Sequence, residues 1–133
     1  MIINSLIESL GEYTKRLEEL TLDDWRALYA GVYLLQIQAQ ALIDIVVKGC
    51  SELGLKVEGY VEAGKKLMDV GIISKEEFEF YRRVVGFRNI AVHAYASIDL
   101  EIVRRIITER EFERVYYLAL KIVNELKKRG IDP

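Results

Sequence analysis

The sequence predicts an all-α protein, and three observations carry this prediction. Apolar residues recur with helical rather than alternating spacing almost throughout the 133 residues. The single proline is the last residue, so no proline interrupts a helix inside the chain. The composition, 51% apolar and 30% charged, is typical of a chain that folds around one core. We therefore expect a single helical domain over residues 1–133.

Start and stop signals divide the chain into helices. Four starts are marked by a hydroxyl residue followed three positions later by an acid, which is the spacing of a capping box or close to it: Ser5 with Glu8, Thr21 with Asp24, Ser74 with Glu77, and Thr108 with Glu111. Three stops follow periodic runs, at residues that readily take a left-handed conformation: Gly54, Gly71 and Gly130. The expected bundle has about five helices, near residues 3–20, 22–53, 58–70, 75–93 and 100–129, and a break of the last near Thr108 stays open.

The second predicted helix is longer than a small bundle needs. At 1.5 Å per residue it would extend about 48 Å. Its apolar positions form a wide stripe, made of Trp25, Leu28, Tyr29, Val32, Leu35, Ala39, Leu42, Ile43 and Val46. We expect most of these side chains to pack in the core and the surplus to meet a second copy of the chain, so that the bundle is dimeric.

Charge and composition exclude several function classes. A net charge of −2 argues against a broad grip on nucleic acid, which draws on many Lys and Arg contacts to phosphates. Any such site must be local, and the candidates are Arg82, Arg83 and Arg88, with Arg104 and Arg105 nearby; the alternative is a solvated helix face. One histidine and one cysteine cannot supply an ordinary zinc site, so we expect no metal and no cofactor. Cys50 is expected to be a small residue within a helix.

The sequence also indicates a compartment. Residues 1–10 include Asn4, Ser5 and Glu8 and lack the basic start and unbroken apolar core of a signal peptide. No stretch approaches the roughly 20 apolar residues that span a bilayer. We expect no association with a membrane and a cytoplasmic location.

The segment from Phe87 to Tyr95, at the end of the fourth predicted helix, contains the only histidine. Alone, His93 would be read as a helix cap or packing residue. On an ideal helix Asn89 and His93 share one face, whereas Arg88 and Tyr95 share another about 100° away. Arg88 and His93 lie about 140° apart. They can meet at one phosphate if Arg88 reaches round, if the helix ends or distorts near His93, or if a two-fold partner supplies the second residue; the spacing favours a cleft at a dimer interface.

The pattern of Arg88, four residues, His93, one residue and Tyr95 resembles the signature of the HEPN superfamily in the form found in HepT toxins. The resemblance covers essentially the whole chain and extends to four further segments, residues 17–20, 40–44, 87–89 and 98–99. It implies an up-and-down helical bundle that dimerises so that two copies of the motif face one cleft. It also implies endoribonuclease activity without metal.

The residue types suit that reaction. Attack by a ribose 2′-hydroxyl needs a proton acceptor, a donor for the leaving 5′-oxygen, and positive charge for the developing phosphorane. Imidazole changes protonation near neutral pH, so His93 can serve as acid or base, with a second His93 from the other subunit. Arg88 offers a permanently charged fork for phosphate oxygens, and Asn89 would orient His93 or the substrate. Asp44 is either an ordinary carboxylate paired with an arginine or a contact of this site, and we leave it out of the catalytic set.

Tyr95 allows two interpretations. It can pack beside the cleft, or it can be the acceptor of AMP from an MNT-type minimal nucleotidyltransferase antitoxin, as the resemblance to type VII toxin–antitoxin systems implies. An added AMP would block RNA by bulk and charge. Two other functions stay open for the whole chain: a non-catalytic module that binds nucleotide or a nucleotidyltransferase partner, and a structural dimer with a chance motif.

Overall fold

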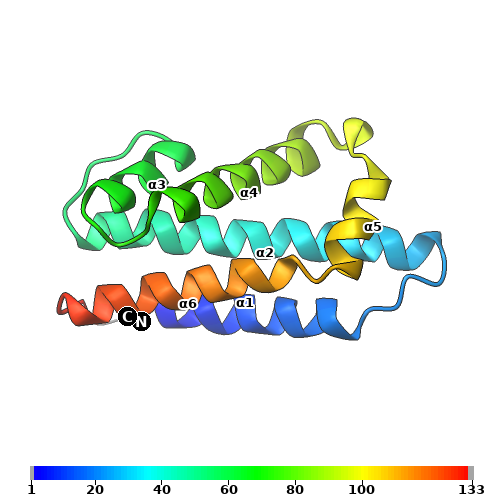
Figure 1. Ribbon diagram of the computed structural model, residues 1–133, viewed down its shortest axis with the longest axis horizontal. Coiled ribbons are helices and arrows are strands. Elements are labelled where there is room, and N and C mark those ends of the chain that lie inside the picture. The colour runs from blue at the N-terminus through cyan, green and yellow to red at the C-terminus, as the bar shows by residue number, and fades with distance from the viewer. Residues whose placement is uncertain (1, 132–133) are drawn as a thin grey trace.

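The computed structural model describes residues 2–131, and within them six α-helices and one 3-10 helix follow one another without a strand (Figure 1). The elements are α1 (Ile2–Glu19), α2 (Trp25–Glu52), α3 (Tyr60–Asp69), α4 (Lys75–His93), η1 (Tyr95–Ser97), α5 (Leu100–Thr108) and α6 (Phe112–Lys128). The all-α prediction is confirmed. The last predicted helix is broken after Thr108, so the bundle has six α-helices where about five were expected.

Helix α2 is the central element, and all five other α-helices pack against it. Helices α3 and α4 run along one side of α2, α1 and α6 run along the other, and α5 crosses near its N-terminal end (Figure 1). At 28 residues α2 is about 42 Å long. Residues 39, 41–43 and 45–46 of α2 are all buried, which confirms its predicted role in the core.

The N-terminal half of α2 keeps part of its apolar surface outside the core. Trp25, Tyr29 and Tyr33 follow one another at intervals of four residues and are 67%, 56% and 60% exposed. Of the predicted stripe, Trp25 and Tyr29 therefore lie outside the core, Val32 is half-buried, and the other members are buried. We call Trp25, Tyr29 and Tyr33 the aromatic stripe. It is the surplus apolar surface that the length of this helix predicted.

The expectation that no segment approaches a membrane span was wrong for α2. By length and composition this helix is apolar enough to cross a bilayer. However, 56% of its most apolar window is buried inside the bundle, against helices on both sides. A core helix of a globular protein passes the same test, because both environments select apolar side chains.

One predicted helix start has the full geometry of a capping box. The Ser74 hydroxyl accepts from the backbone N–H of Glu77 at 3.1 Å, and the Glu77 carboxylate accepts from the backbone N–H of Ser74 at 2.7 Å. Helix α4 consequently begins at Lys75, as predicted. The three glycine stops are also confirmed, since Gly54, Gly71 and Gly130 all have φ between 73° and 84° just after a helix end.

The other three predicted starts were wrong. Ser5 lies inside α1, because the buried face of that helix already begins at Ile3. Asp24, rather than Thr21, caps α2: its carboxylate accepts from the N–H groups of residues 26 and 27. Thr108 is the last residue of α5 and caps nothing.

Arg110 makes the break between α5 and α6. Its φ of 58° is left-handed, a conformation usually left to glycine. The turn is closed by the N–H of Glu111, which donates to the carbonyl of Ile106 at 3.0 Å. The Arg110 side chain forms ion pairs with Glu18 and Glu113. These contacts hold a helix terminator that carries no glycine signal in the sequence.

Cys50 lies within α2, as expected, and its side chain is buried in the core. Its Sγ donates to the backbone carbonyl of Ala63 at 3.3 Å, and burial raises the pKa of the thiol to about 11. The thiol therefore stays protonated at neutral pH.

Candidate active site

Helix α4 ends at His93, as the sequence predicted, and carries the candidate residues to one end of the molecule. The N–H of Ala94 donates to the carbonyl of Ile90 at 2.9 Å and closes the last turn. The chain then enters η1, so Tyr95 lies outside the helix. The ideal-helix alignment of Arg88 with Tyr95 therefore does not apply, because the helix ends at His93, which was one of the alternatives left open.

Arg88 points toward the bundle. It is half-buried, and its Nε donates to Oε1 of Gln40 on α2 at 2.7 Å. One terminal nitrogen, Nη1, donates to Oδ1 of Asn89 at 3.0 Å. The centre of the guanidinium lies 5.3 Å from the ring centroid of Tyr60 at the start of α3. Two hydrogen bonds and a cation–π contact thus define the position of this charge.

The close approach of α3 to α4 explains why Tyr60 lies under Arg88. A Cβ atom on Gly64 would meet the ring of Tyr81 at 2.4 Å, so glycine lets the two helices touch. The Tyr81 hydroxyl donates to the backbone carbonyl of Tyr60 at 2.8 Å, and burial raises the pKa of this hydroxyl. The start of α3 is therefore anchored to α4, one side chain away from Arg88.

Asp44 is joined to this site through Gln40. The Gln40 amide nitrogen donates to Asp44 Oδ1 at 2.8 Å, while its oxygen accepts from Arg88. Asp44 forms no ion pair with an arginine within residues 2–131. Of the two alternatives for Asp44, contact with the site is closer to what is found. Sequence reasoning missed Gln40; its signal was the i, i+4 spacing of Gln40 and Asp44 on one helix face.

His93 and Tyr95 point outward. Both are exposed, Tyr95 to 75%, and within residues 2–131 neither side chain forms a hydrogen bond. Asn89 is bonded to Arg88 and not to His93. His93 follows Arg88 by five positions, which on a helix is about 7.5 Å of rise. One chain therefore brings together Arg88 and Asn89 but does not bring His93 to the same point.

The five arginines considered as a nucleic-acid patch are divided among several environments. Arg82 is paired with Glu79 at 2.7 Å and Arg104 with Glu101 at 3.8 Å, each within one helix. Arg83 and Arg105 line a groove that does not include Arg88. Of this patch, only Arg88 belongs to the candidate site.

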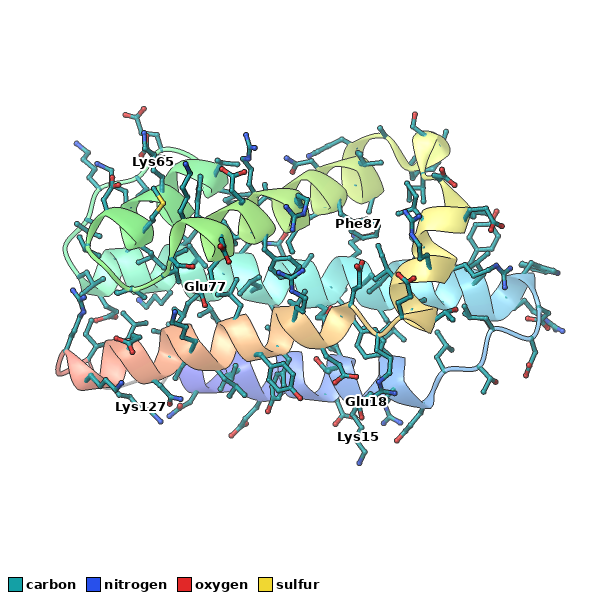
Figure 2. The ribbon with its side chains drawn as sticks, viewed as in Figure 1. Lys15, Glu18, Lys65, Glu77, Phe87 and Lys127 are labelled. Carbon is teal, nitrogen blue, oxygen red and sulfur yellow. The ribbon has the colours of Figure 1, made fainter. Side chains whose placement is uncertain are left out.

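That groove, of about 840 Å³, lies between α2, α4, α5 and α6. Its lining is mostly apolar and includes Phe87, which projects from α4 toward α2 and α5 (Figure 2). Arg88, Asn89, His93 and Tyr95 do not line it. The candidate site therefore lies outside this groove. The described part of the chain also holds no group of three His, Cys, Asp or Glu side chains that could bind a metal ion.

The comparisons with known proteins agree with this fold and this motif. Residues 3–122 match the family model of HepT-like ribonucleases. The chain belongs to the HepT-like family. The match includes α1 through α5, the motif at the end of α4 and most of α6, so the resemblance seen in the sequence is confirmed.

One curated relative of this HepT-like chain is a protein of Archaeoglobus fulgidus that carries the name Putative RNase. The two are 31% identical over 99 residues, which is 74% of each chain.

Solved structures share the fold of this HepT-like chain. A tri-AMPylated HEPN toxin of Shewanella oneidensis, solved in complex with an MNT antitoxin, has a TM-score of 0.76 at 24% identity over 88% of this chain and 95% of that one. The cytosolic protein YutE of Bacillus subtilis, whose function is unknown, has the same TM-score at 16% identity over 98% and 95%. At these identities the likeness shows the fold alone, and it confirms the predicted HEPN-type bundle.

Proposed function

We propose that this HepT-like chain is a metal-independent endoribonuclease toxin that acts as a homodimer. The carrying observation is the arrangement at the end of α4, where Arg88 is held by Gln40 and Asn89 while His93 is exposed five residues further on. A fixed cation and a free imidazole are the groups that cleavage by an RNA 2′-hydroxyl requires.

In the proposed reaction, His93 of one chain takes the proton of the 2′-hydroxyl as its oxygen attacks the adjacent phosphorus. Arg88 stabilises the negative charge that develops on the non-bridging oxygens. His93 of the other chain gives a proton to the departing 5′-oxygen, so that the P–O5′ bond breaks. The products are a 2′,3′-cyclic phosphate and a free 5′-hydroxyl. Asn89 acts through Arg88, to which it is bonded.

Two observations support the dimer. Within one chain Arg88 faces α2 whereas His93 faces solvent, so a second copy is the simplest source of the missing imidazole. The aromatic stripe leaves three large side chains exposed on α2, the helix that also carries Gln40. Exposed apolar patches of this kind mark surfaces that are covered by another protein. We propose that the aromatic stripe covers its counterpart, or the end of α4, in the second copy.

Mixed dimers should reveal whether the two copies share one cleft. A dimer of one wild-type chain and one His93→Ala chain, isolated through two different tags, is expected to cleave RNA about 100-fold more slowly than the wild-type dimer, because it lacks either the acid or the base. Two independent sites would leave half of the activity. The control is a mixed dimer with Arg16→Ala, a surface change on α1, which should stay fully active. A monomer in sedimentation at micromolar concentration would contradict the proposal before the assay begins.

Cleavage is expected to continue unchanged in excess EDTA, because imidazole and guanidinium groups supply the proposed chemistry. The products should carry the cyclic phosphate and 5′-hydroxyl named above, which mass spectrometry of a short defined RNA would identify. Activity lost on chelation and restored by a divalent ion would reject the mechanism.

We further propose that the partner of this toxin is an MNT-type nucleotidyltransferase antitoxin, which silences it by transferring AMP to Tyr95, and that both act in the cytoplasm. The AMPylated HEPN toxin of Shewanella oneidensis, solved with an MNT antitoxin, supports the proposed partner by analogy. The exposure of Tyr95 supports its role as the AMP acceptor, because an exposed side chain is accessible to another enzyme.

The alternative is a non-catalytic module that binds the nucleotidyltransferase or a nucleotide. The observation in its favour is that Arg88 and His93 do not converge in one chain. Growth arrest on expression of the chain alone, relieved by His93→Ala, would favour the toxin. Stable binding to the partner without any cleavage of RNA would favour the module.

A further inference from the structure

The guanidinium of Arg88 has partners at two of its three nitrogens. Of its three nitrogens, Nε is bonded to Gln40 and Nη1 gives one hydrogen to Asn89, while Nη2 has no partner among residues 2–131. A guanidinium offers five N–H donors in a fixed plane. Restraining Nε, the nitrogen nearest the aliphatic chain, fixes the rotation of that plane and leaves Nη2 free to donate to a phosphate oxygen.

The amide of Gln40 has a defined orientation. Its nitrogen donates to Asp44 at 2.8 Å, and a carboxylate can only accept, so the amide nitrogen must face Asp44. The amide oxygen then faces Arg88, to which it is 2.7 Å distant. A reversed amide would present an N–H group to the N–H of Arg88 and lose both bonds. Asp44 accepts and Arg88 donates, so both favour this orientation, and the bond to Asp44 holds the Gln40 oxygen toward Arg88.

We infer that Gln40 is a positioning residue for Arg88, and that Asp44 acts through it by orienting the amide. This inference rests on the proposed ribonuclease function for its catalytic meaning. Gln40 comes from α2 and Arg88 from α4, so the bond couples the central helix to the candidate site.

The neutral amide has a chemical advantage over a carboxylate at the same place. A carboxylate directly on Arg88 would form an ion pair and cancel the charge that the phosphate needs. Because Gln40 lies between them, Asp44 orients the Gln40 amide without contacting Arg88 directly. The cation is held in place and its charge stays available for a phosphate.

Four variants of the full-length chain separate positioning from stability. Gln40→Leu removes the bond to Arg88 and keeps much of the volume. Gln40→Glu keeps an acceptor but adds the charge. Asp44→Ala frees the amide to turn, whereas Asp44→Asn keeps an oxygen that accepts from Gln40. The matched control is Gln36→Leu, the same substitution one turn earlier on α2 at a half-buried side chain that forms no hydrogen bond within residues 2–131.

The kinetic result expected for Gln40→Leu and Asp44→Ala is a fall in kcat of about 10- to 100-fold with KM changed less than about twofold, because a misplaced cation fails mainly in the transition state. For Gln40→Glu we expect a higher KM and weaker binding of an RNA whose 2′-hydroxyls are methylated, since the charge on Arg88 is cancelled. Asp44→Asn should recover most of the kcat that Asp44→Ala loses, and Gln36→Leu should behave as wild type.

A spectroscopic measurement tests the same inference without any activity. The Nε–H signal of Arg88, assigned by its absence in Arg88→Lys, should exchange slowly with water in the wild type and in Asp44→Asn. It should exchange fast in Gln40→Leu and Asp44→Ala. If the wild type cuts no RNA, the proposed function fails and this signal alone decides the positioning. The inference is overturned if Gln40→Leu leaves the signal protected, or if it leaves kcat at the wild-type value.

Discussion

His93→Ala is expected to reduce RNA cleavage by about 10⁴-fold or more, because in a shared cleft it removes the general acid and the general base together. Each of these contributions is ordinarily worth about 10²- to 10⁴-fold. The measurement is single-turnover cleavage of a labelled RNA by purified wild-type and variant dimers. Expression of the variant should also no longer arrest growth.

Because His93 is exposed, we expect His93→Ala to affect activity without affecting the stability of the fold. Its side chain is exposed and forms no hydrogen bond within residues 2–131, so the thermal midpoint of unfolding should change little. Arg16→Ala serves as a control for the loss of a surface charge. A His93→Ala dimer that still cleaves at more than about one-tenth of the wild-type rate would exclude His93 from proton transfer.

Modification of Tyr95 is the second large effect expected. Incubation with an MNT-type nucleotidyltransferase, ATP and Mg²⁺ should add one or more AMP units at Tyr95, with release of pyrophosphate as the tyrosine oxygen bonds to the α-phosphorus. Cleavage should fall roughly tenfold or more, since the added phosphate repels RNA and the nucleoside obstructs the cleft. Intact-mass measurement and peptide sequencing would give the extent and the site.

Two tyrosine variants make this test specific. Tyr95→Phe should prevent the modification and keep much of the cleavage, because the hydroxyl is not part of the proton transfers. Tyr117→Phe changes another exposed tyrosine, on α6, and should still be modified and silenced. His93→Ala should show the opposite pattern, with AMP accepted and no cleavage. Silencing of Tyr95→Phe by the partner would show that the regulatory residue is a different one.

Helix ends could be predicted from the sequence where the residues that form them are close together in the chain. Ser74 and Glu77 form their capping box within three residues, and Gly71 ends α3 through its own backbone conformation. The same local logic placed the end of α4 at His93, and with it the order of Arg88, His93 and Tyr95 along the chain. The family resemblance depended on this order, and the match over residues 3–122 confirms it.

Prediction of helix starts from the capping spacing failed where contacts between distant residues determined the helix boundary. Ser5 and Thr108 have the spacing of a cap, yet burial of Ile3 begins α1 earlier, and the left-handed turn at Arg110 determines where α5 ends and α6 begins. Arg110 carries no glycine signal in the sequence, and its pairing with Glu18 joins the turn between α5 and α6 to the distant helix α1.

The sequence by itself determined the all-α class, most helix ends, and which residues are chemically suited to cut RNA, because periodicity, capping and side-chain chemistry are properties of short segments. Only the tertiary structure decided how those residues are supported. Gln40 and Arg88 are 48 residues apart, and they meet because α4 packs along α2. Tertiary packing likewise buried one part of the α2 stripe and left Trp25 and Tyr29 exposed, because the other helices of the described chain do not cover the side of α2 that carries them.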